Sequence, residues 1–294
     1  MVTAVAIVGV PTDFGVDRRG VDMGPSAIRY ADLNACLARA AVDSVDTGDI
    51  NVSVPRDHNN WASIRALWEL LGDRIAEHRC SGRVPLVLGG DHSISIGTLL
   101  GLADADAVGV LWFDAHGDFN TPATSTTGNV HGMPLALATG TGSFATDALA
   151  DTLSVRADRT ALIGVRSLDD TEATSLRESP VSVFTMADID EFGIAAVVRE
   201  AIELVTRDVD IVFVSLDLDV LDPIEAPGVG TPVRGGITYR EAHLAMELIG
   251  SNITATGRLG ALELVEVNPI RDRLNETGEL AAELAASAFG DRII

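Results

Sequence analysis

Lysine is absent from this chain of 294 residues, and cysteine is scarce. The two cysteines, Cys36 and Cys80, lie far apart and outside any metal-binding spacing, so we expect reduced thiols in the core. No apolar run reaches the roughly 18 residues of a membrane span, and the apolar N-terminus lacks the basic segment and cleavage pattern of a signal peptide. The sequence therefore predicts a cytoplasmic protein without a membrane segment or a cysteine-based metal site.

Positive charge is scarce as well. All 21 basic residues are arginine, and 43 residues are acidic, which gives a net charge of −22. Such a surface repels nucleic acid and anionic membranes, which argues against either as a partner. The acidic residues are scattered and 47% of the chain is hydrophobic, so a disordered acidic interaction protein is disfavoured. We favour adaptation to a salt-rich cytoplasm, where a Debye length of about 3 Å at molar salt screens the self-repulsion.

Apolar, β-branched runs alternate with helix-like segments along the whole chain. Strands are predicted at residues 2–10, 42–46, 84–88, 108–113, 160–165, 181–185, 211–216 and 259–265. Helices are predicted at residues 25–40, 170–178, 194–206 and 279–289, and from the Thr238/Glu241 capping box to residue 249. A long amphipathic helix is predicted after Asn59, its cap, and a further helix is predicted to follow residue 93 and run to residue 102. Strands that are apolar throughout and alternate with helices indicate a mainly parallel sheet covered on both faces. We predict one α/β domain over residues 1–294.

Polar side chains gather just after the predicted strands, at the sheet edge where open α/β proteins place their sites. One buried run ends in Asp114, His116 and Asp118, which would point to the same side of an extended segment. A loop rich in Asn and Thr follows and ends at His131. Two other strand ends carry His92, and Asp217 with Asp219.

These groups are four carboxylates and two imidazoles without a thiolate, a set that suits Mn²⁺ better than Zn²⁺ or Cu²⁺. Taken singly, each motif has a structural interpretation, such as a cap or a tight turn. Taken together, the six side chains are more ligands than one ion needs, and four carboxylates around one ion would repel each other. Two ions bridged by carboxylates and a water meet both constraints and lower the pKa of that water. The sequence therefore predicts a dinuclear hydrolase.

Five motifs resemble those of the ureohydrolase superfamily in order and spacing, over about residues 6–269. They are GGDHS (89–93), DAHGDFNTP (114–122), GNVHGMP (128–134), SLDLDVLDP (215–223) and EVNP (266–269). The loop between residues 120 and 134 is similar to that of the arginases, whereas agmatinases and formimidoylglutamases differ there. The resemblance implies a three-layer α-β-α fold with a mainly parallel sheet, arginase/deacetylase-like, and a homo-oligomer, either a trimer or a hexamer.

The resemblance also implies roles for the strand-end residues in hydrolysing L-arginine to L-ornithine and urea. One Mn²⁺ would be bound by His92, Asp114, Asp118 and Asp217, and the other by Asp114, His116, Asp217 and Asp219, with Asp114 and Asp217 bridging. Asp118 would also hold the bridging hydroxide. Glu266 would pair with the substrate guanidinium, whose planar donors a carboxylate orients well. His131 would move protons near pH 7.

The amino-acid end of the substrate would be bound by the polar loop. The resemblance places Asn120, Thr127 and Asn129 at the α-carboxylate, Asp169 with Glu172 behind it at the α-ammonium, and Thr231 near the guanidinium. Asp169 also has a structural interpretation as a helix N-cap. Thr127 stands where many arginases have Ser, and Ser167 where some have an acid.

Two alternatives remain open at this point. One is an agmatinase or another guanidino-compound ureohydrolase, which would act on a substrate without the α-carboxylate. The other is a catalytically silent metal-binding module, since acidic proteins can serve as interaction hubs. The complete ligand sets and His131 argue against the second.

The acidic composition leads to a prediction about salt. We expect dialysis from molar to low salt to unfold the protein, because the repulsion among 43 acidic residues is no longer screened. Far-UV circular dichroism against salt concentration measures this. Unchanged secondary structure at low salt would contradict the salt-rich interpretation.

Overall fold

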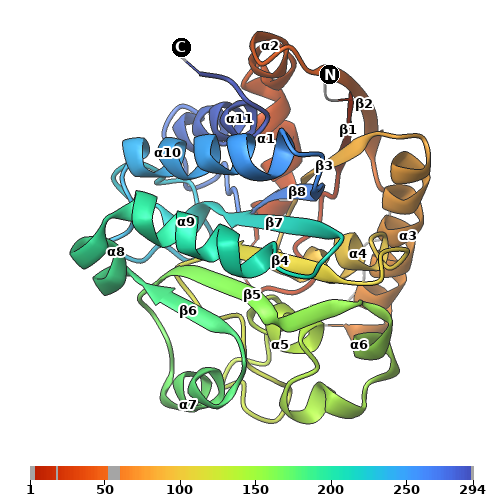
Figure 1. Ribbon diagram of the computed structural model, residues 1–294, viewed down its shortest axis with the longest axis vertical. Coiled ribbons are helices and arrows are strands. Elements are labelled where there is room, and N and C mark those ends of the chain that lie inside the picture. The colour runs from red at the N-terminus through yellow and green to blue at the C-terminus, as the bar shows by residue number, and fades with distance from the viewer. Residues whose placement is uncertain (1–3, 18, 52–59, 293–294) are drawn as a thin grey trace.

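The computed structural model describes residues 4–17, 19–51 and 60–292, and a parallel sheet runs through its centre (Figure 1). The strands are β1 (Ala4–Gly9), β2 (Asp43–Asp49), β3 (Val84–Leu88), β4 (Val108–Phe113), β5 (Val155–Val165), β6 (Ser182–Thr185), β7 (Ile211–Asp217) and β8 (Leu259–Val265). They form one 8-stranded sheet in the order β2-β1-β3-β8-β7-β4-β5-β6. Every neighbouring pair is parallel. Strands that are distant in sequence are therefore neighbours in the middle of the sheet.

Helices cover both faces of the sheet. One layer contains α1 (Gly24–Tyr30), α2 (Leu33–Arg39), α8 (Met186–Phe192), α9 (Ile194–Val205), α10 (Tyr239–Ile249) and α11 (Glu276–Ala288). The other contains α3 (Trp61–Cys80), α4 (Ser95–Leu100), α5 (Pro134–Ala138), α6 (Ala148–Thr152) and α7 (Asp170–Glu178). Short 3₁₀ turns, η2 (His92–Ile94), η3 (Val130–Gly132) and η5 (Leu218–Val220), lie at the strand ends.

The core is divided into two apolar clusters by the sheet itself. Successive strand residues point to opposite faces, so Leu111 packs in one cluster and its neighbour Trp112 in the other. Every residue of β4 and of β8 is buried, which requires a helical layer on each side. The predicted three-layer α/β fold is confirmed.

Several predicted boundaries are wrong. The helix expected at residues 25–40 is two helices, because Asp32 adopts φ +55° and ends the first helical path. The edge strand β2 continues to Asp49, since its backbone pairs with β1 although its side chains are mostly polar. Strand β5 begins at Val155, before the predicted residue 160, and α11 begins at Glu276 instead of residue 279.

Two predicted segments reach beyond the described part of the chain. Asn59, the expected cap of the long amphipathic helix, lies outside the described residues, as do residues 2 and 3 of the first strand. In the structure Asn60 caps α3, because its side chain accepts a hydrogen bond from the Ser63 N–H at 3.1 Å.

The expectation that both thiols lie in the core is half wrong. Cys36 is buried on α2, but Cys80 is exposed at the last residue of α3. The amphipathic helix α3 buries one face only, and Cys80 follows the last buried position of that face, Ile75. Among the described helices, none is both long enough and apolar enough to cross a bilayer.

One arginine fastens the loop that follows β7. The Arg166 guanidinium donates hydrogen bonds to the backbone carbonyls of Gly164, Asp219, Val220, Leu221 and Val233. These carbonyls come from the end of β5, from η5 and from the loop beyond it. Arg166 therefore ties two strand ends together through main-chain atoms.

We expect Arg166→Leu to lower the free energy of unfolding by about 2–4 kcal/mol, because it leaves partly buried carbonyls without donors. Chemical denaturation measures the change. The matched control is Arg156→Leu, which removes an arginine whose side chain is 41% exposed and pairs with Asp158, and it should change the free energy of unfolding far less. Equal losses in the two variants would contradict the fastening role of Arg166.

Candidate active site

The central strands β3, β8, β7 and β4 are neighbours, and a polar residue lies at or just after the end of each, at the same edge of the sheet. His92 lies in η2 after β3, and Glu266 follows β8 directly. Asp217 is the last residue of β7, and Asp114 follows β4. Parallel pairing brings these carboxyl ends together, which is why residues far apart in the sequence meet here.

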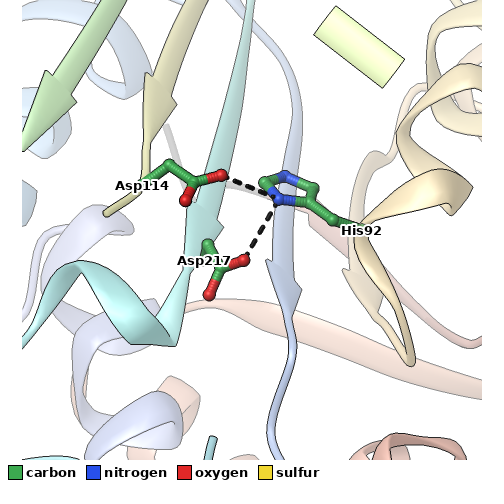
Figure 2. Close-up of side chains that lie close together, drawn as sticks. All are labelled: His92, Asp114 and Asp217. Carbon is green, nitrogen blue, oxygen red and sulfur yellow. Dashed lines mark ion pairs between the residues drawn. The ribbon is translucent and has the colours of Figure 1, made fainter. Parts of the chain in front are cut away.

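The first cluster surrounds one nitrogen atom of His92. Its Nδ1 lies 3.2 Å from Asp114 Oδ2, 3.1 Å from Asp118 Oδ2 and 3.2 Å from Asp217 Oδ2. Figure 2 shows the carboxylates of Asp114 and Asp217 pointing at this nitrogen from neighbouring strands. The side chains are at most 8% exposed, so the group is almost cut off from solvent.

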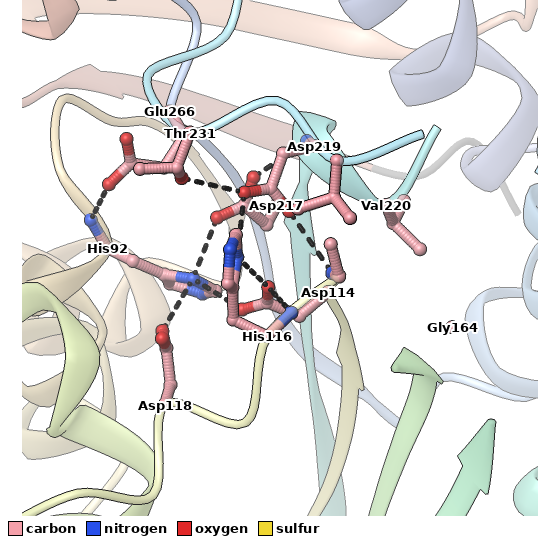
Figure 3. Close-up of polar contacts among 12 residues, drawn as sticks. His92, Asp114, His116, Asp118, Gly164, Asp217, Asp219, Val220, Thr231 and Glu266 are labelled. Carbon is pink, nitrogen blue, oxygen red and sulfur yellow. Dashed lines mark hydrogen bonds and ion pairs between the residues drawn. The ribbon is translucent and has the colours of Figure 1, made fainter. Parts of the chain in front are cut away.

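The second cluster surrounds His116. Its Nδ1 lies 3.0 Å from Asp219 Oδ2 and 3.5 Å from Asp114 Oδ1. Asp114 thus turns one oxygen to each imidazole, and Figure 3 shows it between them. Asp217 keeps Oδ2 toward His92 because its Oδ1 accepts the Asp219 N–H at 2.7 Å.

The donor set fits divalent cations. His92, Asp114 and Asp217 form one group whose ligand atoms lie within 4.8 Å of one another, and Asp114, His116 and Asp219 form a second such group. Among the described residues, His92 Nδ1 and Asp118 Oδ2 have no hydrogen-bond partner although both are buried. Buried polar atoms without partners are costly, so this edge is built for a positively charged ligand.

The electrostatics point the same way. Burial raises the pKa of Asp118, the charge of Asp114 adds to it, and the pKa reaches about 7. Burial alone would lower the pKa of His116, but the charge of Asp219 and hydrogen bonds to Asp114 and Asp219 raise it to about 12. Protons balance the charge of the crowded carboxylates here, which is the condition in which a divalent cation could take their place.

A second imidazole–carboxylate pair lies beside the first cluster. His131 Nδ1 is 3.0 Å from Glu266 Oε1, and the same oxygen accepts the backbone N–H of His92 at 3.0 Å. Burial alone would lower the pKa of His131, but the negative charge of Glu266 and the hydrogen bond with it raise this pKa to about 9. The other oxygen, Glu266 Oε2, is buried and has no hydrogen-bond partner within the described ranges. It is therefore available to a cationic ligand.

The clusters lie at the end of a pocket of about 340 Å³. Its lining includes six of the residues that the sequence assigns to substrate, Asn120, Thr127, Asn129, Asp169, Glu172 and Thr231, but not Glu266, which lies behind His131. His116, Asp118, His131 and Asp217 also line it, and so does Ser167. The structure brings the predicted residues together, while their roles stay predictions.

Asp169 satisfies both interpretations of the sequence. Its Oδ1 caps α7 by accepting the N–H groups of Thr171 and Glu172, both at 2.9 Å. Its Oδ2 accepts a hydrogen bond from Asn120 Nδ2 at 2.9 Å, so the same carboxylate also lies in the pocket wall. Thr231, by contrast, donates its hydroxyl to Asp219 Oδ2 at 3.0 Å.

Burial raises the pKa of Glu172 to about 7, although the Phe119 N–H donates to its Oε1 at 2.9 Å and acts against the rise. The nearby charges of Asp118 and Asp169 contribute to this rise. A cation in the pocket would stabilise the ionised form of a carboxyl group whose pKa is raised in this way. The predicted contact with the α-ammonium group requires such a cation.

Sequence reasoning missed some residues that hold the site in place. Asp91 is fully buried, and its Oδ2 accepts the Gly15 N–H at 3.1 Å, while the Gly15 carbonyl accepts the His131 N–H at 3.0 Å. Ser215 and Glu263 lie inside apolar strands, and the Ser215 hydroxyl is 2.8 Å from His92 Nε2. A polar residue in a fully apolar strand was the available signal for both.

The fold and the site together define a class: an open parallel α/β protein with a buried carboxylate–imidazole metal-type centre at the carboxyl edge of its sheet. The arginase family model matches residues 3–290. An arginase from Brevibacillus brevis is 46% identical over 298 residues, which cover 99% of each chain. The chain therefore belongs to the arginase family.

Solved structures agree with this assignment. The structure of an arginase from Bacillus caldovelox is similar with a TM-score of 0.92 at 43% identity, and each chain is covered to 100%. That of the Entamoeba histolytica arginase in complex with L-ornithine has a TM-score of 0.87 at 30% identity, covering 99% of this chain and 100% of that one. The arginase-like fold that the motifs implied is confirmed.

The carboxylate-rich centre leads to a prediction about metal and stability. We expect Mn²⁺ to raise Tm after chelator treatment, and saturation at about 100 times Kd adds about 2.7 kcal/mol to the free energy of unfolding. Asp114→Asn should gain much less, because Asp114 belongs to both ligand groups. Differential scanning calorimetry with and without Mn²⁺ measures this. The exposed Asp158→Asn should respond like the wild type, and an equal response of Asp114→Asn would contradict the site.

Proposed function

We propose that this arginase-family chain hydrolyses L-arginine to L-ornithine and urea at a centre of two Mn²⁺ ions. The observation that carries the proposal is the coincidence of two features at one sheet edge. A set of four buried carboxylates, one buried imidazole and one half-buried imidazole lies at the end of a pocket whose wall is lined by neutral donors and acids. The first feature suits metal-assisted hydrolysis, and the second suits an amino acid.

The metal ligands would be the two clusters around the imidazoles. His92, Asp114, Asp118 and Asp217 would hold one ion, and Asp114, His116, Asp217 and Asp219 the other. When bound, the two ions would supply hydroxide from water near neutral pH. Hard carboxylate oxygens with two imidazoles and no thiolate favour Mn²⁺ over softer ions.

Glu266 would orient the guanidinium. Its Oε1 is fixed by the His92 N–H and by His131, whereas the buried Oε2 faces no donor among the described residues. A guanidinium N–H would satisfy that oxygen with a charge-assisted hydrogen bond. Burial alone would raise the pKa of Glu266, but the charge of His131 and the hydrogen bond from it lower this pKa. The Glu266 carboxylate therefore stays ionised.

His131 would carry the proton. Attack of hydroxide on the guanidinium carbon forms a C–O bond, and breaking the bond from that carbon to the side-chain nitrogen releases urea and ornithine. The leaving nitrogen needs a proton, and His131 lines the pocket with its pKa raised to about 9, so it holds a proton at neutral pH. His131 donates this proton, and the hydroxyl group on the attacked carbon gives up its own proton as the carbonyl of urea forms, so the protons balance.

The pocket wall would select an α-amino acid. Asn120, Thr127 and Asn129 offer uncharged donors to the α-carboxylate, and a cation there would compete with the guanidinium. Asp169 and Glu172 would accept the α-ammonium, and Thr231 would hold the loop near the guanidinium through Asp219. The L-ornithine complex of the Entamoeba histolytica relative supports an amino-acid ligand for this pocket. Agmatine lacks the α-carboxylate and would leave these donors without a partner.

Further properties follow from composition and resemblance. We infer one domain over residues 1–294, a homo-oligomer that is a trimer or hexamer, and a cytoplasmic location. The net charge of −22 supports function in high salt.

The experiment that tests the function compares L-arginine with agmatine, by urea release with Mn²⁺ across salt concentrations. Arginine should be the better substrate. Asn129→Ala should raise KM for arginine by about 10-fold or more with a smaller fall in kcat, because it binds the non-reacting end. Thr126→Ala alters the same pocket wall without an assigned contact and serves as the control. Faster turnover of agmatine, or a selective loss of kcat in Asn129→Ala, would overturn the proposal.

A further inference from the structure

On the side of its ring that faces away from the carboxylate cluster, His92 contacts a buried polar network that takes no part in the proposed reaction. His92 Nε2 lies 2.8 Å from the hydroxyl of Ser215, and Ser215 in turn donates to Glu263 Oε1 at 3.2 Å. Both Ser215 and Glu263 are 0% exposed. A carboxyl group buried in the middle of a sheet is costly unless its oxygens are well hydrogen-bonded.

The register of the sheet makes this network possible. Glu263 on β8 lies opposite Ser215 on β7, and Ser215 lies opposite Trp112 on β4. The three side chains therefore stand in one row on the same face of the sheet. The His92 ring lies on this row: it stacks on the Trp112 ring with centroids 4.1 Å apart and planes inclined by 14°. The row fixes both the plane of the imidazole and the direction of its Nε2.

With Glu263 ionised, the donors and acceptors of the network can be arranged in one way. Glu263 receives hydroxyl hydrogen bonds from Ser95, Thr98 and Ser215. Because the Ser215 proton points to Glu263, its oxygen has only lone pairs left for His92. His92 Nε2 must then carry a proton and donate it to Ser215. The lone pair of His92 is consequently on Nδ1, the atom that faces Asp114, Asp118 and Asp217.

We propose that Glu263 and Ser215 are positioning residues that fix the tautomer and orientation of His92, so that Nδ1 presents its lone pair to a metal ion. The inference rests on the proposed metal centre, because without a bound ion the tautomer has nothing to serve. Partners behind a ligating histidine commonly change metal affinity by about 10- to 100-fold. His92 belongs to one ligand group and His116 to the other, so the effect falls on one of the two ions.

The chain offers a matched pair of variants for the test. Ser215→Ala and Ser95→Ala each remove one hydroxyl donor to Glu263 Oε1, but only Ser215 also contacts His92. Free Mn²⁺ is followed by electron paramagnetic resonance during titration of the chelator-treated full chain, and far-UV circular dichroism verifies folding. Glu263→Gln, which keeps the shape and removes the charge, is the second variant if Ser215→Ala does not fold.

We expect the wild type to bind two Mn²⁺. In Ser215→Ala and in Glu263→Gln, the affinity for one of the two should fall by about 10- to 100-fold, while Ser95→Ala stays close to the wild type. KM for arginine at saturating Mn²⁺ should be unchanged, since neither residue lines the substrate pocket.

Three outcomes would overturn the positioning role. Equal losses in Ser215→Ala and Ser95→Ala would assign the effect to general packing around Glu263. If Ser215→Ala and Glu263→Gln both bind Mn²⁺ with wild-type affinity, the two residues have no positioning role. A wild type that binds no Mn²⁺ would overturn the proposed metal centre first, and the positioning role with it, so the two failures are distinguishable.

Discussion

Repulsion among carboxylates at the edge of the sheet is the constraint on which the rest of the structure depends. Asp114, Asp118, Asp217 and Asp219 meet around two imidazoles with little solvent to screen them. The fold holds them in place with main-chain donors: Asp114 accepts the His116 N–H, Asp217 the Asp219 N–H, and Asp219 the Ala115 N–H. Asp217 is thus anchored by Oδ1 and turns Oδ2 toward His92, whereas Asp114 and Asp219 accept a further hydrogen bond on Oδ2, from Trp112 Nε1 and from the Thr231 hydroxyl.

Backbone strain accompanies this arrangement. Asp118 and Glu266 adopt φ values of +48° and +64°, a region that side chains other than glycine rarely occupy. Both follow ends of central strands, and both turn toward the site an oxygen that has no hydrogen-bond partner among the residues the structure describes. Such strain persists only where the surroundings fix the conformation, and it concentrates at functional sites. Here the parallel pairing of β8 with β3 and β7 fixes the residue that precedes Glu266.

The meeting of the two imidazole–carboxylate clusters was predictable because local rules place their residues at strand ends. An apolar strand followed by Asp114, His116 and Asp118 indicates a site whatever the topology of the sheet. The Glu263–Ser215–His92 network was not predictable, since it depends on which strands are neighbours and in what register. The break after Tyr30 was missed for a related reason: Asp32 is neither Gly nor Pro, and its left-handed backbone gives no signal in the sequence. Propensity is local, whereas both features arise from tertiary packing.

The connection between the N-terminal loop and His131 shows how far the support of the site extends. A Cβ on Gly90 would come 1.8 Å from the Thr12 carbonyl oxygen, so only glycine lets the loop after β1 lie against the turn after β3. That contact brings Gly15 within reach of Asp91, and the Gly15 carbonyl then accepts the His131 N–H. Asp91 next to His92 therefore supports His131, while Glu263 and Ser215 support the His92 ring. The same short turn after β3 thus fixes both the metal side and the proton-transfer side of the proposed reaction.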